Sequence, residues 1–218
     1  MRQSHTEENY LKAIYSLSEI QPEGVSTKSI GELLEIKSPT VSDMLKKLAS
    51  KKLIKYERYK GVSLTKGGEI IALKVIRKHR LWETFLVNKF GFKWDEVHDI
   101  AEQLEHIDSG KLVDRLDAYL GFPQFDPHGD PIPNKNGIIS ILYERTLDQV
   151  GEGEKVILVG VKDHTKLFLK YLESNNLTLG ARISVLQAVE YDRSLVVRIG
   201  RKGERSLSFQ VCKNLYVK

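Results

Sequence analysis

The chain has 218 residues, of which 41% are hydrophobic and 29% are charged, and its formal net charge is +5. This composition is ordinary for a globular protein with two or three small domains and excludes a fibrous or fully disordered chain. A single cysteine excludes a disulfide framework. No apolar run is long enough to cross a bilayer, and the polar, acidic N-terminus is unlike a signal peptide, so we expect a cytoplasmic protein with no membrane partner.

Three helices are predicted in the first fifty residues. Apolar side chains recur at the helical period over residues 7–17 and again after a cap at Ser26 or Thr27. In the third helix Ser38 is expected to be the cap and Pro39 the first helical residue. The short interval between the second and third helices is typical of a helix-turn-helix.

A β-hairpin is predicted directly after the third helix. Residues 53–57 and 62–65 have the composition of strands, and residues 58–61 join them as the tip. Three helices followed by a hairpin form a winged helix-turn-helix, in which the hairpin is the wing. We therefore expect residues 1–70 to be a DNA-binding domain.

Positive charge is concentrated on the third helix and the hairpin. Between positions 46 and 66 the only acid is Glu57, whereas lysine and arginine are frequent. A charge run is usually only a solvated face, but this one coincides with the two elements that would neutralise phosphates. Short hydroxylated side chains crowd the helix start, the end that enters the major groove. The residues expected to contact DNA are Ser38, Pro39, Thr40, Ser42, Asp43, Lys46, Lys47, Arg58, Tyr59 and Lys60.

Two later stretches carry metal-ligand side chains at helical spacing. These side chains are His79, Glu83, His98, Glu102, Glu105 and His106. Spacings of three and four place the members of each stretch on one face of a helix. Two such helices side by side would direct three imidazoles and three carboxylates into one volume, which is a ligand set for one or two divalent cations. Either stretch alone is more often a solvated His–Glu pair, but the two together favour a metal site.

The rest of the chain is predicted as a helical domain followed by a β domain. Lys66-Gly67-Gly68 interrupts the pattern, and residues 71–140 then form a helical metal-binding domain, apolar enough for a dimer seam as well as a core. Residues 141–150 are a linker after a Pro- and Gly-rich connection. Residues 151–218 read as short strands with one helix, and the last strand is expected over 206–211. The predicted fold is mainly α with a small antiparallel β-barrel.

The order of these motifs resembles the diphtheria toxin repressor and manganese transport regulator family of metal-dependent transcriptional regulators. The resemblance covers nearly the whole chain and is strongest at Asn9-Tyr10-Leu11 through Ile14-Tyr15, Ser38-Pro39-Thr40-Val41-Ser42, Leu64-Thr65-Lys66-Gly67-Gly68, Arg77-Lys78-His79-Arg80-Leu81-Trp82-Glu83, and Val97-His98-Asp99 through Leu104-Glu105-His106. It implies a homodimer that binds Mn²⁺ or Fe²⁺ and a double-stranded DNA operator and represses metal-uptake genes. It also implies a C-terminal barrel of Src-homology-3 type.

The resemblance also assigns the ligand candidates to two metal positions. The first position is assigned to His79, Glu83 and His98. The second position is assigned to Glu102, Glu105, His106 and Asn9. The chain departs from the family at Asn9, where an acid or a thioether is common, and at Lys12, where the shorter manganese regulators have a ligand carboxylate. The β domain can add a ligand from Asp163 or His164.

The oxygen-rich donor set decides the expected metal. Glu102 stands where iron-type relatives carry a soft sulfur ligand, so Mn²⁺ is favoured and Fe²⁺ is next. We predict a homodimeric, Mn²⁺-activated DNA-binding repressor that is not an enzyme. One alternative is a carboxylate-bridged bimetal enzyme, although such bundles need a Glu-x-x-His pair on two helices. The other alternative is a winged-helix regulator that senses a non-metal signal.

Overall fold

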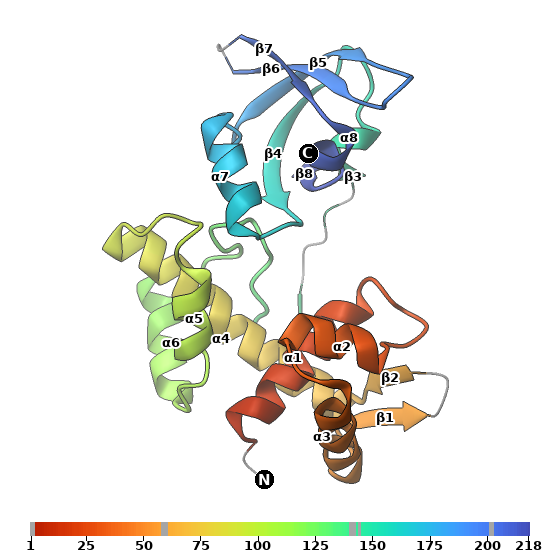
Figure 1. The fold of residues 1–218 in the computed structure, drawn as a ribbon. Helices are drawn as coiled ribbons and strands as arrows, with labels where there is room; N and C mark the ends of the chain where they lie inside the picture. The colour runs from red at the N-terminus through yellow and green to blue at the C-terminus, as the bar shows by residue number, and fades with distance from the viewer. Residues whose placement is uncertain (1–2, 58–60, 140–142, 144, 201–202) are drawn as a thin grey trace. The chain divides into compact units, whose positions relative to one another are not determined.

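The computed structural model describes residues 3–57, 61–139, 143, 145–200 and 203–218 (Figure 1). The chain divides into two compact units. The first unit comprises Met1–His79, Glu102–Gly110 and Pro133–Ile138, and the second comprises Arg80–Ala101, Lys111–Ile132 and Ile139–Lys218. The domain boundaries expected at residues 70, 140 and 150 stay predictions.

The N-terminal part has the predicted three helices and hairpin. These elements are α1 His5–Ser18, α2 Thr27–Leu34, α3 Ser38–Ser50, β1 Ile54–Glu57 and β2 Gly61–Leu64. Ser4 and Glu7 form a capping box at the start of α1, and the Ser26 hydroxyl caps α2. The prediction that Ser38 caps α3 is wrong. The carbonyl of Lys37 already accepts the first hydrogen bond of the helix, so Ser38 is itself helical.

One continuous apolar core holds these elements together. The side chains of Leu11, Ile14 and Leu45 have no exposed surface, and they lie on three different turns of α1 and α3. Their helical spacing is the pattern from which the helices were predicted. Packing of this amphipathic face supplies most of the stability of such short helices, because isolated helices of this length are marginal in water.

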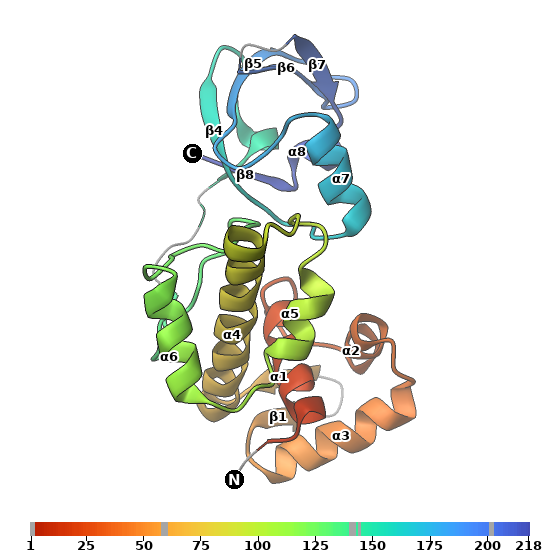
Figure 2. The same ribbon diagram turned by 90° about the vertical axis from the view of Figure 1, so that its left-hand side faces the viewer.

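Three helices follow: α4 Lys66–Phe90, α5 His98–Leu104 and α6 Gly110–Tyr119. The predicted interruption at Lys66-Gly67-Gly68 is wrong, because α4 begins there. The Thr65 hydroxyl accepts the backbone N–H of Gly68, and any side chain at Gly68 would collide with the Leu53 carbonyl oxygen. Glycine at this position therefore allows the close approach of helix and hairpin. Figure 2 shows α5 and α6 beside α4. Leu81 of α4 and Leu116 of α6 belong to one small buried core.

The C-terminal part is an antiparallel β domain with the strand order β3-β8-β4-β5-β6-β7. Its strands are β3 Arg145–Thr146, β4 Lys155–Val161, β5 Arg182–Ala188, β6 Leu195–Ile199, β7 Glu204–Leu207 and β8 Leu215–Val217. Its helices are η1 Leu147–Gln149, α7 Lys166–Ser174 and α8 Phe209–Cys212. The predicted Src-homology-3 type is confirmed, although no pairing within the described strands joins β7 back to β3. The strand expected over 206–211 is wrong beyond Leu207, because Ser208 caps α8.

Candidate metal centre

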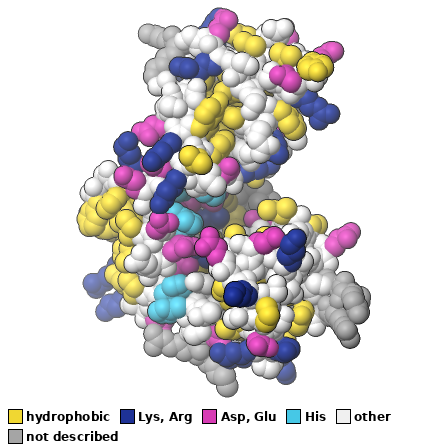
Figure 3. Space-filling model, viewed as in Figure 1, with side chains coloured by type: hydrophobic (Ala, Val, Ile, Leu, Met, Phe, Trp, Pro, Cys, Tyr) yellow, Lys and Arg dark blue, Asp and Glu magenta, His cyan; other side chains and the backbone are white. Residues whose placement is uncertain are grey.

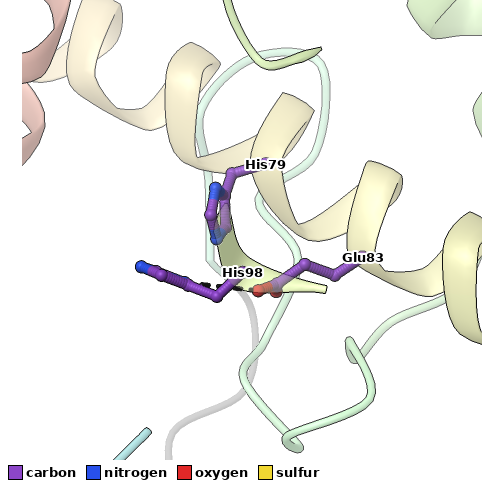
Figure 4. A group of neighbouring side chains, drawn as sticks. All are labelled: His79, Glu83 and His98. Carbon is purple, nitrogen blue, oxygen red and sulfur yellow. Dashed lines mark ion pairs between the residues drawn. The ribbon is translucent and has the colours of Figure 1, made fainter. Parts of the chain in front are cut away.

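The first group of candidate ligands lies on α4 and at the start of α5. His79 and Glu83 are one helical turn apart, and one potential ligand atom of each lies within 4.8 Å of one on His98 (Figure 4). Glu83 Oε1 is 3.5 Å from His98 Nδ1. Only 6% of His79 and 2% of Glu83 is exposed. The His98 side chain is 45% exposed. Two imidazoles and one carboxylate arranged in this way fit a divalent transition-metal ion.

A carboxylate orients the His79 ring. Glu105 Oε2 lies 2.6 Å from His79 Nδ1, so Nδ1 donates its hydrogen to this carboxylate. With the hydrogen on Nδ1, the lone pair of the ring is on the other nitrogen, Nε2. Histidine ligands of metals commonly have this arrangement, in which a carboxylate fixes the tautomer and makes the ring more basic.

Glu105 is almost fully buried, with 1% of its residue surface exposed. Besides His79, it accepts a hydrogen bond from Lys12 Nζ at 2.7 Å. Burial raises the pKa of Glu105, but the hydrogen bond from His79 and the charge of Lys12 outweigh burial and hold the pKa below its ordinary value of 4.5. The carboxylate is therefore ionised at neutral pH, as a metal ligand must be.

His106 pairs with a carboxylate that the sequence did not single out. Its Nδ1 lies 2.6 Å from Glu8 Oε2 on α1, and its Nε2 lies 3.8 Å from Glu105 Oε1. Asn9, the residue expected to complete this second position, is exposed. Glu8 and Lys12 are four residues apart on α1, a spacing that indicates one shared face of the helix.

Glu102 is the outermost residue of the predicted set. Its side chain is 54% exposed, and its Oε1 lies 3.7 Å from Lys12 Nζ. Helix α5 ends at Leu104, so Glu105 and His106 lie in the turn that follows it rather than on the predicted continuous helix. The structure therefore brings Glu105 and His106 close to each other and to α1, and leaves Glu102 at the rim.

A second compact group shares Glu83 and includes two residues outside the predicted set, Asp126 and His128. His128 Nδ1 lies 3.6 Å from Glu83 Oε2, while its Nε2 contacts the Trp94 carbonyl oxygen at 2.8 Å. Burial lowers the pKa of His128, but the hydrogen bond and charge of Glu83, with the charge of Asp126, outweigh it and raise the pKa to about 9. A positively charged His128 therefore helps to fix the position of the Glu83 carboxylate through Oε2. A loop histidine gave no sequence signal of this role.

The predicted DNA-contacting residues of α3 lie on one side of the helix. Ser38, Pro39, Thr40, Asp43, Lys46 and Lys47 are exposed, and Ser42 is half-buried. The opposite side, with Val41, Leu45 and Leu48, is buried in the core. Lys46 pairs with Asp43 at 3.1 Å and Lys47 with Glu7 at 3.0 Å. Arg58, Tyr59 and Lys60 lie outside the described residues.

Three family descriptions match successive parts of the chain. They are an iron-dependent repressor N-terminal DNA-binding domain over residues 3–62, an iron-dependent repressor metal-binding and dimerisation domain over 65–134, and a FeoA domain over 145–218. A solved manganese-dependent transcriptional repressor in complex with manganese is 37% identical, with a TM-score of 0.87, and the match covers 97% of this chain and 98% of that one. The chain belongs to the diphtheria toxin repressor and manganese transport regulator family.

Two further relatives are named, one for manganese and the other for iron. The structure of the manganese regulator SloR is 35% identical, with a TM-score of 0.80, and the match covers 97% of each chain. The iron-dependent repressor IdeR of Mycobacterium leprae is 39% identical over 130 residues, which are 59% of this chain. The match spans only 55% of that curated relative's length. These family members are named as regulators and repressors, not as enzymes.

Proposed function

We propose that this chain is a homodimeric, metal-activated repressor that binds a DNA operator, and that Mn²⁺ is its activator, with Fe²⁺ as the alternative. The observation that carries the proposal is the group of His79, Glu83 and His98, of which His79 and Glu83 are buried, in a chain of this family. The genes under its control would be metal-uptake genes, as the family resemblance implies. No helix within the described residues is long and apolar enough to span a membrane, and we propose a cytoplasmic location.

The contacts of α1 support a mechanism for activation. On α1, Glu8 contacts His106 and Lys12 contacts Glu105. An ion held by Glu105 and His106 would therefore change the contacts of the first helix of the DNA-binding domain. Metal binding would then favour one arrangement of that domain, and the free energy of binding would appear as higher DNA affinity. The coupling is reciprocal, so DNA should also tighten metal binding.

The experiment that tests the proposal measures DNA binding across a panel of divalent metals, with the bound metal counted for each. We expect Mn²⁺ to give the largest increase in affinity. DNA binding that is the same with and without every metal would favour the alternative of a regulator that senses another signal.

The metal preference gives a first prediction. Glu102 supplies a hard oxygen at the rim of the second position, and a thiolate there would favour softer ions. Glu102→Cys is expected to shift the ratio of Mn²⁺ to Co²⁺ activation by on the order of tenfold towards Co²⁺. Fluorescence anisotropy of labelled operator DNA at each metal concentration measures this ratio. An unchanged ratio would remove Glu102 as a selectivity element.

The exposed side of α3 gives a second prediction. Lys46 and its partner Asp43 are both exposed, and a surface ion pair of this kind costs little to exchange for a phosphate contact. Lys46→Ala should reduce the slope of log affinity against log salt by about 0.9 and weaken binding to all sequences alike. Thr40→Ala should instead change which operator is preferred. Lys135→Ala, in an exposed position away from α3, is the control. A Lys46 variant with the wild-type slope would contradict this assignment.

The dimer surface gives a third prediction. Phe90, Tyr119 and Phe122 are each more than 60% exposed, and Figure 3 shows hydrophobic side chains gathered over the C-terminal end of α4. Phe90 also packs edge-on against Phe85, with ring centroids 5.0 Å apart. Exposed aromatic clusters of this kind mark interfaces. Phe90→Asp should weaken the homodimer by about 30-fold, or ~2 kcal/mol, in sedimentation equilibrium. Tyr191→Asp, in the β domain, should leave it unchanged.

A further inference from the structure

The side chain of Lys12 ends beside Glu105 and Glu102 of the second metal position and beside His79 of the first. Its Nζ lies 2.7 Å from Glu105 Oε2, 3.2 Å from His79 Nδ1 and 3.7 Å from Glu102 Oε1. Only 18% of the lysine side chain and 1% of the Glu105 side chain is exposed. A positive charge therefore sits where three metal-ligand side chains converge.

This ammonium and a metal ion compete for the same oxygen. An ion bound to Glu105 Oε2 would lie about 2.1 Å from that oxygen, and so no more than about 5 Å from an ammonium that stays in place. Two cations this close in a pocket with little water repel each other strongly. The lysine stem is long and flexible, so the ammonium can move to solvent when an ion arrives.

We propose that Lys12 is a tethered cation that occupies Glu105 in the metal-free protein and must leave before a metal binds there. Lys12 thereby sets the metal concentration at which the second position fills. This inference rests on the proposed metal-activated function and identifies the residue that regulates it. Lys12 lies on the Nδ1 side of His79, whereas the lone pair of that ring is on Nε2. The competition therefore acts on the second position, through Glu105.

A purely structural role for Lys12 makes a different prediction. A lysine that only ties α1 to the turn after α5 would contribute to stability and have no influence on metal affinity. Replacing it would then lower the melting temperature and leave metal binding unchanged, or weaken metal binding because Glu105 becomes misplaced.

The test is a calorimetric titration of the full chain with Mn²⁺, with the bound metal counted after removal of the excess. Lys12→Met keeps the length and helix propensity of the side chain and removes the charge. We expect the second position to bind Mn²⁺ about tenfold more tightly or better in this variant, with the first position unchanged. Lys12→Gln should show the same gain. Lys12→Arg, which keeps a cation, should resemble the wild type.

Two further variants locate the effect. Lys28→Met removes an exposed lysine that pairs with Glu32 on α2, and it should leave both affinities unchanged. Glu105→Gln added to Lys12→Met should remove the gained affinity. Folding of each variant is checked by circular dichroism. Wild-type affinity in both uncharged Lys12 variants would overturn the inference while leaving the proposed function intact. A wild-type protein that binds no Mn²⁺ would overturn the proposed function, and the inference with it.

Discussion

Replacing Glu83 with glutamine is expected to weaken Mn²⁺ binding by about 100-fold or more and to abolish metal-activated DNA binding. Glu83 faces His98 with one carboxylate oxygen and His128 with the other, and it is 2% exposed. The amide keeps the size and one oxygen but removes the negative charge that holds a divalent ion. Calorimetry with Mn²⁺ and anisotropy with operator DNA measure the two effects.

The control for this variant is Glu69→Gln. Glu69 is exposed in the first turn of the same helix, and its replacement removes the same charge without touching the candidate site. Circular dichroism should show both variants folded. Normal Mn²⁺ affinity in the Glu83 variant would mean that the His79, Glu83 and His98 group is not a metal site.

The second large effect concerns stability. Glu7→Ala should lower the free energy of unfolding of the N-terminal part by about 2–3 kcal/mol. Glu7 has no exposed surface and accepts from Lys51 at 2.7 Å, from Lys47 at 3.0 Å and from the backbone N–H of Ser4. The expected loss of stability is smaller than for a fully buried ion pair, because both lysines are partly exposed. Hydrogen exchange over residues 3–57 measures the loss where it occurs.

The same pairing predicts a pH dependence. Burial raises the pKa of Glu7, but the hydrogen bonds from Lys51 and Lys47 outweigh it and hold the pKa below the ordinary value of 4.5. A lowered pKa in the folded state means that the stabilisation is present above pH 4.5 and is lost as the pH falls through the folded value. Glu7→Ala should remove this part of the acid sensitivity. Glu32→Ala, at a surface pair, should change stability by no more than about 0.5 kcal/mol.

Much of the fold followed from periodicity. The buried positions of α1 and α3 recur every three or four residues, and Ser26 marked the start of α2. The short strands β3 and β8 have two and three residues, which is too few for alternation to be visible. Glycine disfavours helices, so Gly68 on its own predicts an interruption between the hairpin and the next helix. In the folded chain its missing side chain allows close packing against Leu53, a contact that no local pattern encodes.

Part of the candidate site was likewise predictable from spacing along the chain, and part depends on packing between distant segments. Spacing along α4 placed His79 and Glu83 on one face, and the structure confirms that His98 lies close to both. The partner on α1 was not predictable in this way, because the rotation of α1 about its own axis depends on packing. That rotation buries Tyr10, exposes Asn9 and turns Glu8 towards His106. The roles of Lys12 and His128 likewise depend on contacts between distant segments.

Helix α1 carries two adjacent carboxylates that reach different neighbours. Glu7 holds Lys47 and Lys51 at the C-terminal end of α3, whereas Glu8 holds His106. Tyr10, Leu11 and Ile14, further along α1, are packed in the core, which disfavours bending of the helix. Under the proposed function, a shift imposed at Glu8 would therefore be transmitted through Glu7, the adjacent residue, to Lys47 and Lys51. Metal occupancy beside His106 would then alter the position of α3, the helix that we propose contacts the DNA.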